Sequence, residues 1–210
     1  MTFQTIISLG EGCEVAYQLR RHFGTERAGM FDWLILPPRG LGRLLHDGPD
    51  ELLQLDELEP IDGGNTIVTR RYGIAFHHEF RRGGDGLVKV HRIASQLANV
   101  RAKYQALWER LNSDCLAGGP VLFVCSRRRE ADLDGVGLDD GEALAELRAA
   151  AMTRWPGADL RFLFLGYTPW FVADDVTFDQ VEGGDPADWR GSDLGWDQML
   201  QRNRVELKSV

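Results

Sequence analysis

The chain has 210 residues, 43% of them hydrophobic and 27% charged, and its formal net charge is −8. This length suits one domain with a single core, and an acidic chain lacks the basic footprint that nucleic-acid binding requires. Its apolar runs are shorter than the ~20 residues of a membrane helix, and its first residues form no basic secretory region. We therefore expect a cytoplasmic protein that binds neither membranes nor nucleic acid, with its oligomeric state left open.

The first predicted unit is a strand, a turn and a helix. The apolar run 6–9 predicts a buried strand, the glycines Gly10 and Gly12 a tight turn, and helical spacing begins at Cys13. A helix N-terminus offers unpaired N–H groups and about half a positive charge, which stabilise a thiolate and a developing oxyanion. Cys13 is therefore a candidate nucleophile, with Gly10 and Gly12 shaping its oxyanion site. The alternative is a small apolar residue that packs the helix start.

Residues 28–38 are dense in aromatic and aliphatic side chains around a single acid, Asp32. A carboxylate there is either a turn-forming residue near the prolines or a buried acid that needs a partner. In the second case His78 would be a suitable partner, and Asp32 would fix the tautomer of that histidine. Trp33, the next residue, is a candidate substrate contact.

The region 37–87 predicts an irregular or antiparallel insert. Its leucine-rich run 41–58 predicts two short helices, and the short β-branched and apolar runs at 66–69 and 74–76 predict strands.

His77 and His78 follow the second of these strands. Neighbours on an extended segment face opposite sides, so one of the pair should face Cys13, and His78 is the candidate general base. His77 is then a candidate substrate contact, and the alternative is that backbone groups satisfy both rings. Adjacent histidines diverge and rarely share an ion, so neither a metal site nor a cofactor is expected.

The second half of the chain predicts alternating helices and strands. The expected elements are, in order, a helix over 88–112, a strand at 120–125, a helix at 140–155, a strand at 160–166, a strand at about 176–181 and a helix from about 193 to 206. A strand–helix–strand order with short links predicts parallel neighbours. We therefore expect residues 1–210 to form a single α/β domain, with a mostly parallel central sheet flanked by helices in three layers.

Arginines gather at 70–71, 81–82 and 127–129, at or near strand ends. They could focus an anionic substrate such as a phosphate or carboxylate, with Arg127 as a candidate contact, although exposed arginines are often only solvated. The three cysteines predict no disulfide framework. We expect Cys125 to be buried at the end of its strand and Cys115 to be partly exposed in the link after the long helix.

Three motifs together resemble a bacterial domain family of unknown function described as candidate papain-like cysteine peptidases. Members share a Ser-Leu-Gly-x-x-Cys opening, a Phe-Asp-Trp-Leu block and a His-Asp-Phe element. The matching segments here are 8–13, 31–34 and 78–80, with Glu79 where the family pattern has Asp. The resemblance covers most of the chain. It implies Cys13 as nucleophile, His78 as base and, as an alternative fold, the papain-like α+β arrangement.

The start of the chain and the segment 193–196 are also similar to serine hydrolases of the Gly-Asp-Ser-Leu type, which carry an Asp-x-x-His pair late in the chain. Trp196 stands here in the histidine place, so a base must come from elsewhere. Two functions follow as hypotheses. The first is a cysteine-dependent hydrolase or acyl transferase, peptidase-like or esterase-like, with a small-molecule or peptide substrate. The second is a non-catalytic binding module for an anionic ligand such as a sugar or nucleotide precursor.

Overall fold

A parallel four-stranded sheet organises the molecule. The computed structural model describes residues 1–10, 12–127, 141–185 and 187–208. The strands lie in the order β2 (Thr5–Ser8), β7 (Val121–Ser126), β8 (Leu160–Leu165) and β9 (Val176–Asp179). Every pair is parallel, so all carboxyl ends meet at one edge of this sheet.

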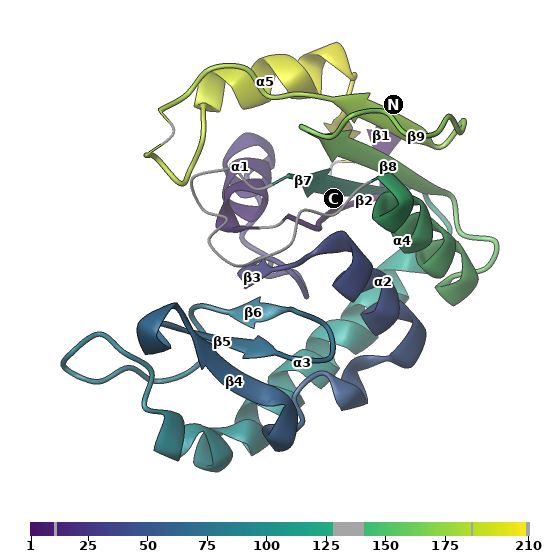
Figure 1. Ribbon diagram of the computed structural model, residues 1–210. Helices are drawn as coiled ribbons and strands as arrows, with labels where there is room; N and C mark the ends of the chain where they lie inside the picture. The colour runs from purple at the N-terminus through teal and green to yellow at the C-terminus, as the bar shows by residue number, and fades with distance from the viewer. Residues whose placement is uncertain (11, 128–140, 186, 209–210) are drawn as a thin grey trace.

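Side chains that alternate along the strands belong to two separate hydrophobic clusters. Phe123 and Cys125 of β7 pack in the larger cluster, whereas Leu122 and Val124 pack in the smaller one. The helices divide between the clusters in the same way. The smaller cluster takes residues of α1 (Cys13–Phe23) and α5 (Asp193–Arg202), and the larger takes residues of α2 (Pro38–Asp47), α3 (Ile93–Cys115) and α4 (Gly141–Arg154). Figure 1 shows α1 and α5 on one side of the parallel strands and α4 on the other.

A second, antiparallel sheet lies beside the first. Its order is β3 (Leu34–Ile35), β6 (Ala75–Phe76), β5 (Thr66–Thr69) and β4 (Leu58–Ile61). The long helix α3 runs past this sheet toward the parallel one (Figure 1). Ile67 of β5, Trp108 of α3 and Phe123 of β7 share the larger hydrophobic cluster, so one continuous core joins both sheets.

Short elements complete the fold. β1 (Thr2–Phe3) pairs in parallel with β10 (Glu206–Leu207) and brings the two ends of the chain together. Single 3-10 turns lie at Pro49–Glu51, Leu55–Glu57, Asp62–Gly64 and Val90–Arg92.

The mixed α/β class, with its parallel sheet, is confirmed, whereas the three-layer and papain-like descriptions stay predictions. The antiparallel character of the 37–87 region is also confirmed. Of the two short helices expected over 41–58, the first corresponds to α2 and the second is wrong, since α2 ends at Asp47 and the chain then forms two 3-10 turns and β4. The physical reason is that Pro49 within this leucine-rich run, and Pro60 just after it, remove backbone donors. Within the described residues, no helix is long and apolar enough to cross a membrane.

A close approach between α2 and the turn after β5 yields a test of the packing. A Cβ built at Gly40 would lie 1.8 Å from the Tyr72 carbonyl oxygen, whereas one at Gly42 would lie 3.4 Å from Leu147 Cα. In the interior of a helix, alanine is normally more favourable than glycine by ~1 kcal/mol. We expect Gly40→Ala to lower the free energy of unfolding by about 1–3 kcal/mol, because the backbone must shift. The measurement is urea denaturation.

Gly42→Ala is the matched control in the same helix, and it should leave the free energy of unfolding unchanged or slightly higher. Equal stability of the two variants would contradict the tight contact between Gly40 and Tyr72.

Candidate functional site

Cys13 is the first residue of α1 and follows β2 at the carboxyl edge of the parallel sheet. Gly12, the N-cap, has an extended backbone and gives no side-chain hydrogen bond to the first turn. The N–H groups of that turn therefore lack the cap that Ser, Thr or Asp would supply. A Cβ at Gly10 would lie 2.6 Å from the Val15 side chain, so a glycine is needed for this entry into the helix. Cys13 is partly exposed and is a thiol rather than half of a disulfide.

One side of α1 carries Cys13, Tyr17 and Arg20, and we call it the Cys13 face. Residues at spacings of three and four lie above one another on a helix, and seven residues span ~10 Å. All three side chains are partly exposed, whereas Val15 and Leu19 lie in the smaller hydrophobic cluster. The Cys13 face therefore points away from the sheet.

Asp32 is tied to this face by an ion pair. Its Oδ2 atom accepts hydrogen bonds from Arg20 Nη2 at 2.5 Å and from the backbone N–H of Gly29 at 2.6 Å. Asp32 lies in a turn and is only 7% exposed, so both sequence-based alternatives hold at once: it is a turn residue and a buried, partnered acid. The turn brings Trp33 under the Arg20 guanidinium, whose central carbon is 5.3 Å from the ring centre.

Trp33 in turn contacts the histidine pair. The centres of the Trp33 and His78 rings are 6.3 Å apart in an edge-to-face arrangement, and those of His77 and His78 are 4.7 Å apart. His77 Nδ1 shares a hydrogen bond of 2.9 Å with Thr66 Oγ1, which holds that ring against β5. His78 is exposed. Arg20 and Trp33 thus connect the Cys13 face to the end of β6.

The hydrogen bond expected between Asp32 and His78 is wrong: Asp32 pairs with Arg20 instead. A permanently charged guanidinium is the stronger partner, because charge-assisted hydrogen bonds gain more than neutral ones. Glu79, the acid that follows His78 in the chain, pairs with Lys103, with 2.8 Å from Lys103 Nζ to Glu79 Oε2. Among the residues that the structure describes, the His78 imidazole has no hydrogen-bond partner.

Two buried polar atoms, one on β2 and one on α1, lack partners in the described part of the chain: Ser8 Oγ and Arg20 Nε. Ser8 ends β2, and the preceding even-numbered residue on that strand, Ile6, packs against the smaller cluster with α1. A buried hydroxyl without a partner is costly unless water or a ligand satisfies it.

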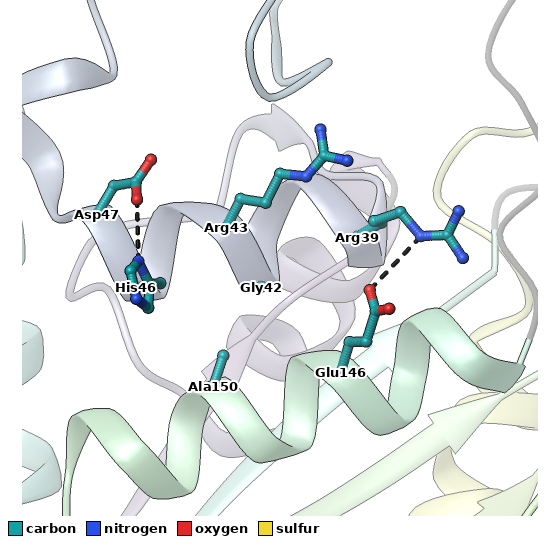
Figure 2. Close-up of a pocket in the computed structure, with 7 residues that line it drawn as sticks. All are labelled: Arg39, Gly42, Arg43, His46, Asp47, Glu146 and Ala150. Carbon is teal, nitrogen blue, oxygen red and sulfur yellow. Dashed lines mark hydrogen bonds and ion pairs between the residues drawn. The ribbon is translucent and has the colours of Figure 1, made fainter.

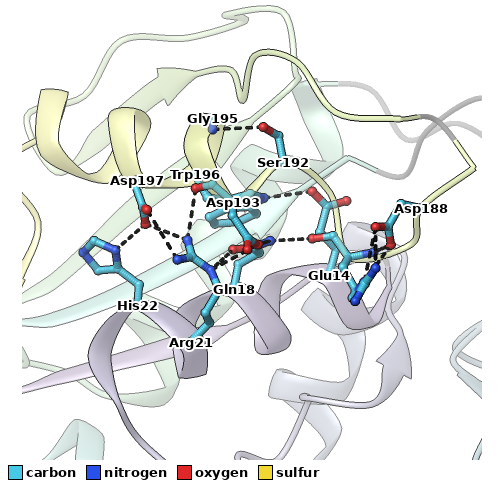
Figure 3. Close-up of polar contacts among 11 residues, drawn as sticks. Glu14, Gln18, Arg21, His22, Asp188, Ser192, Asp193, Gly195, Trp196 and Asp197 are labelled. Carbon is cyan, nitrogen blue, oxygen red and sulfur yellow. Dashed lines mark hydrogen bonds and ion pairs between the residues drawn. The ribbon is translucent and has the colours of Figure 1, made fainter.

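A polar network fixes α5 against the other side of α1 (Figure 3). Gln18 is fully buried, and its Nε2 donates to the Arg190 carbonyl at 2.6 Å and to Asp193 Oδ1 at 2.9 Å. Arg21 donates to Asp197 at 2.6 Å and holds the pKa of that carboxyl below its ordinary value, while His22 Nδ1 lies 2.7 Å from the same oxygen. Helical spacing in the sequence gives no sign of this network, because the partners of Gln18 lie more than 170 residues away in the chain.

Trp196 belongs to the same interface. It is fully buried, and its Nε1 donates to Glu14 Oε1 at 2.8 Å (Figure 3). The residue in the place of a hydrolase histidine therefore serves the packing of α5 on α1 and cannot act as a base.

Arg127 follows β7, where its N–H donates to the Leu165 carbonyl at 2.9 Å. Its side chain is partly exposed and has no partner among the described residues. The other arginine groups differ: Arg71 pairs with Asp47, and Arg82 donates to Asn65 and to the His77 carbonyl. Glu11, Arg128 and Arg129 lie outside the described residues. Among the described residues of these groups, Arg127 and the exposed Arg81 are therefore the cations whose side chains remain to meet an anion, and Arg127 is the one that follows a strand of the parallel sheet.

A pocket of about 210 Å³ lies between α2 and α4 (Figure 2) and is lined by Arg39, Gly42, Arg43, His46, Asp47, Glu146 and Ala150. Its charges largely neutralise one another, since Arg39 lies 3.5 Å from Glu146 and His46 lies 3.0 Å from Asp47. α2 and α4 pack in the larger cluster, and α1 packs in the smaller one. None of the candidate residues from the sequence lines this pocket.

The other two cysteines are structural. Cys125 is fully buried, as expected, and its Sγ lies 3.6 Å from the Tyr167 hydroxyl. The prediction that Cys115 is partly exposed was wrong, because α3 extends to include it and turns its side chain into the core. Burial, with a smaller contribution from Asp114, raises the pKa of the Cys115 thiol to about 12. Cys115 is therefore a protonated, inert thiol at neutral pH.

Comparison with known proteins identifies no relative of this chain. No family model matches the chain, and neither a curated protein nor a solved structure matches it. Within the described residues, no three His, Cys, Asp or Glu side chains group as metal ligands would.

The Arg20–Asp32 pair yields a stability test. Asp32→Asn keeps the shape but removes the charge that holds Arg20, whose Nε is already unsatisfied. We expect the free energy of unfolding to fall by about 1–3 kcal/mol, as when one partner of a largely buried charged pair is removed. Thermal and urea denaturation measure this.

Asp114→Asn is the control, since its partner Arg27 has a side chain that is 57% exposed. Exposed pairs contribute under about 1 kcal/mol, so this variant should remain close to wild type. An Asp32→Asn protein as stable as the control would refute the structural role of the pair.

Proposed function

We propose that the protein is a cysteine-dependent hydrolase or acyl transferase in which Cys13 attacks a carbonyl carbon. The observation that carries this proposal is the position of Cys13, a partly exposed thiol that opens α1 directly after a parallel strand. The N–H groups at the start of α1 and the positive end of the helix dipole stabilise a thiolate there. The same donors would hold the oxyanion that forms when the sulfur–carbon bond is made.

His78 is the proposed base and then acid. It takes the Cys13 proton, the thiolate adds to the carbonyl, and the imidazolium returns the proton to the leaving group. The side chain of His78 is exposed and makes ring contacts only, so its nitrogens are available for proton transfer. Asp32 acts in this scheme by holding Arg20 and Trp33, not by orienting the imidazole.

Arg127 supports an anionic substrate, since its charge is unpaired in the described part of the chain and it follows the strand beside β2. The charge of Arg127 also favours the second function, a non-catalytic module that binds an anionic ligand. The three-layer arrangement and a reducing, cytoplasmic location belong to the proposal. They are supported by the two clusters on opposite sides of the sheet strands and by three thiols outside disulfides.

The reactivity of Cys13 tests the first function. An acidified thiol is already ionised near pH 6, so iodoacetamide should label Cys13 there ~10-fold faster than it labels glutathione. Cys115 and Cys125 should stay unlabelled until the protein unfolds, because both are buried. Peptide mapping by mass spectrometry measures each rate. Slow labelling of Cys13 with the pH dependence of an ordinary thiol would leave the binding module as the better hypothesis.

Substitution of the two histidines separates their roles. We expect His78→Ala to slow Cys13 alkylation at neutral pH and to change the pH dependence of its rate, because the base that takes the thiol proton is gone. His77→Ala should change the profile little, since that ring bonds to Thr66. If His77→Ala changes the pH dependence of the alkylation rate and His78→Ala does not, the assignment of the base to His78 is wrong.

A further inference from the structure

Trp189 is a large aromatic residue that the fold keeps at the surface next to the Cys13 face. Its side chain remains 55% exposed, and its ring centre lies 5.4 Å from that of Tyr17 in an edge-to-face contact. Tyr17 follows Cys13 by one helical turn, which is ~6 Å along the axis. The exposed indole of Trp189 therefore contacts Tyr17, which lies one helical turn from Cys13 on the same face of α1.

The segment that carries Trp189 is held in place by hydrogen bonds on both sides of the indole. The Gly191 N–H donates to the Asp188 carbonyl, and Arg190 forms an ion pair with Asp188 at 2.9 Å. The Arg190 carbonyl accepts a hydrogen bond from the buried side-chain amide of Gln18, and this bond anchors the segment to α1. The exposure of Trp189 is thus fixed by the fold and is not the result of a loose surface segment.

Two tryptophans border the Cys13 face on different sides. Trp33 contacts Arg20 near the end of α1, and Trp189 contacts Tyr17 nearer its start. Trp33 is shielded by Arg20 and His78, whereas Tyr17 is the one ring in contact with Trp189 among the described residues. Of the two, Trp189 therefore offers the larger uncovered apolar surface beside Cys13.

We propose that Trp189 and Tyr17 form a subsite for a planar aromatic ring, carried by the substrate close to the carbonyl that Cys13 attacks. Aromatic rings associate with one another in stacked or edge-to-face geometry and gain more than the burial of apolar area alone. The subsite rests on the proposed function for its role in catalysis, but ring binding there can be measured without turnover. Trp189 would determine specificity and would not take part in proton transfer.

The experiment compares three alkylating reagents at Cys13: iodoacetamide, its N-phenyl derivative and its N-cyclohexyl derivative. Rates are measured at pH 8 by mass spectrometry, each divided by the rate with glutathione. We expect this normalised rate to be about tenfold higher for the N-phenyl reagent than for iodoacetamide, and the increase for the N-cyclohexyl reagent to be much smaller. Equal gains for the two ring reagents, or no gain, would overturn the planar-ring subsite.

Trp189→Ala should abolish the gain, and Trp189→Phe should restore most of it. Trp170→Ala is the matched control, since Trp170 is also exposed, at 69%, but contacts Gly141 at the start of α4. Melting temperatures verify that each variant folds. If Trp170→Ala removes the gain as fully as Trp189→Ala does, the assignment to Trp189 is wrong.

The two proposals fail in different ways. An ordinary pKa for the Cys13 thiol would overturn the catalytic function while leaving the reagent ratio at pH 8 intact. A reagent ratio of one with rapid labelling at pH 6 would overturn the subsite and leave the nucleophile standing.

Discussion

The ion pair between Arg20 and Asp32 connects the two sheets at the proposed site. Arg20 belongs to α1, which packs on the parallel sheet, and Asp32 lies in the turn that leads into β3 of the antiparallel sheet. A largely buried carboxylate needs a partner, and a guanidinium supplies both charge and hydrogen bonds. Because the turn is fixed in this way, Trp33 lies against Arg20 and His78 lies against Trp33. The placement of Trp33 and His78 relative to Arg20 thus depends on this single pair.

Much of the fold could be predicted from local sequence patterns. Continuous apolar runs marked β7 and β8, and glycine punctuation with a change of period marked the passage from β2 to α1. These signals act over short distances, so one sequence suffices to find them. β4 was missed because its residues, Leu58–Ile61, carry a proline and two exposed positions and resemble no buried strand.

The surroundings of the candidate site were harder to predict, because they come from contacts between distant segments. Gln18 has the spacing of a surface residue, yet it is buried because Arg190 and Asp193 supply its hydrogen bonds. Asp32 was expected to need a partner, but sequence alone could not choose between a histidine and an arginine. Cys115 was placed in a link because the polar residues before it resemble a helix end, whereas α3 continues for one more turn.

The proposal of His78 as the base rests on where the histidines lie. His22 bonds to Asp197 on the α5 side, His46 lies in the pocket between α2 and α4, and His91 belongs to the 3-10 turn before α3. His77 is held by Thr66. On the α5 side of α1 the buried Trp196 bonds to Glu14, so that interface is closed by packing. In the part of the chain that the structure describes, His78 and His91 are the histidines without a hydrogen bond to a ring nitrogen. Of these two, His78 is the one in ring contact with Trp33, which supports it as the proposed base.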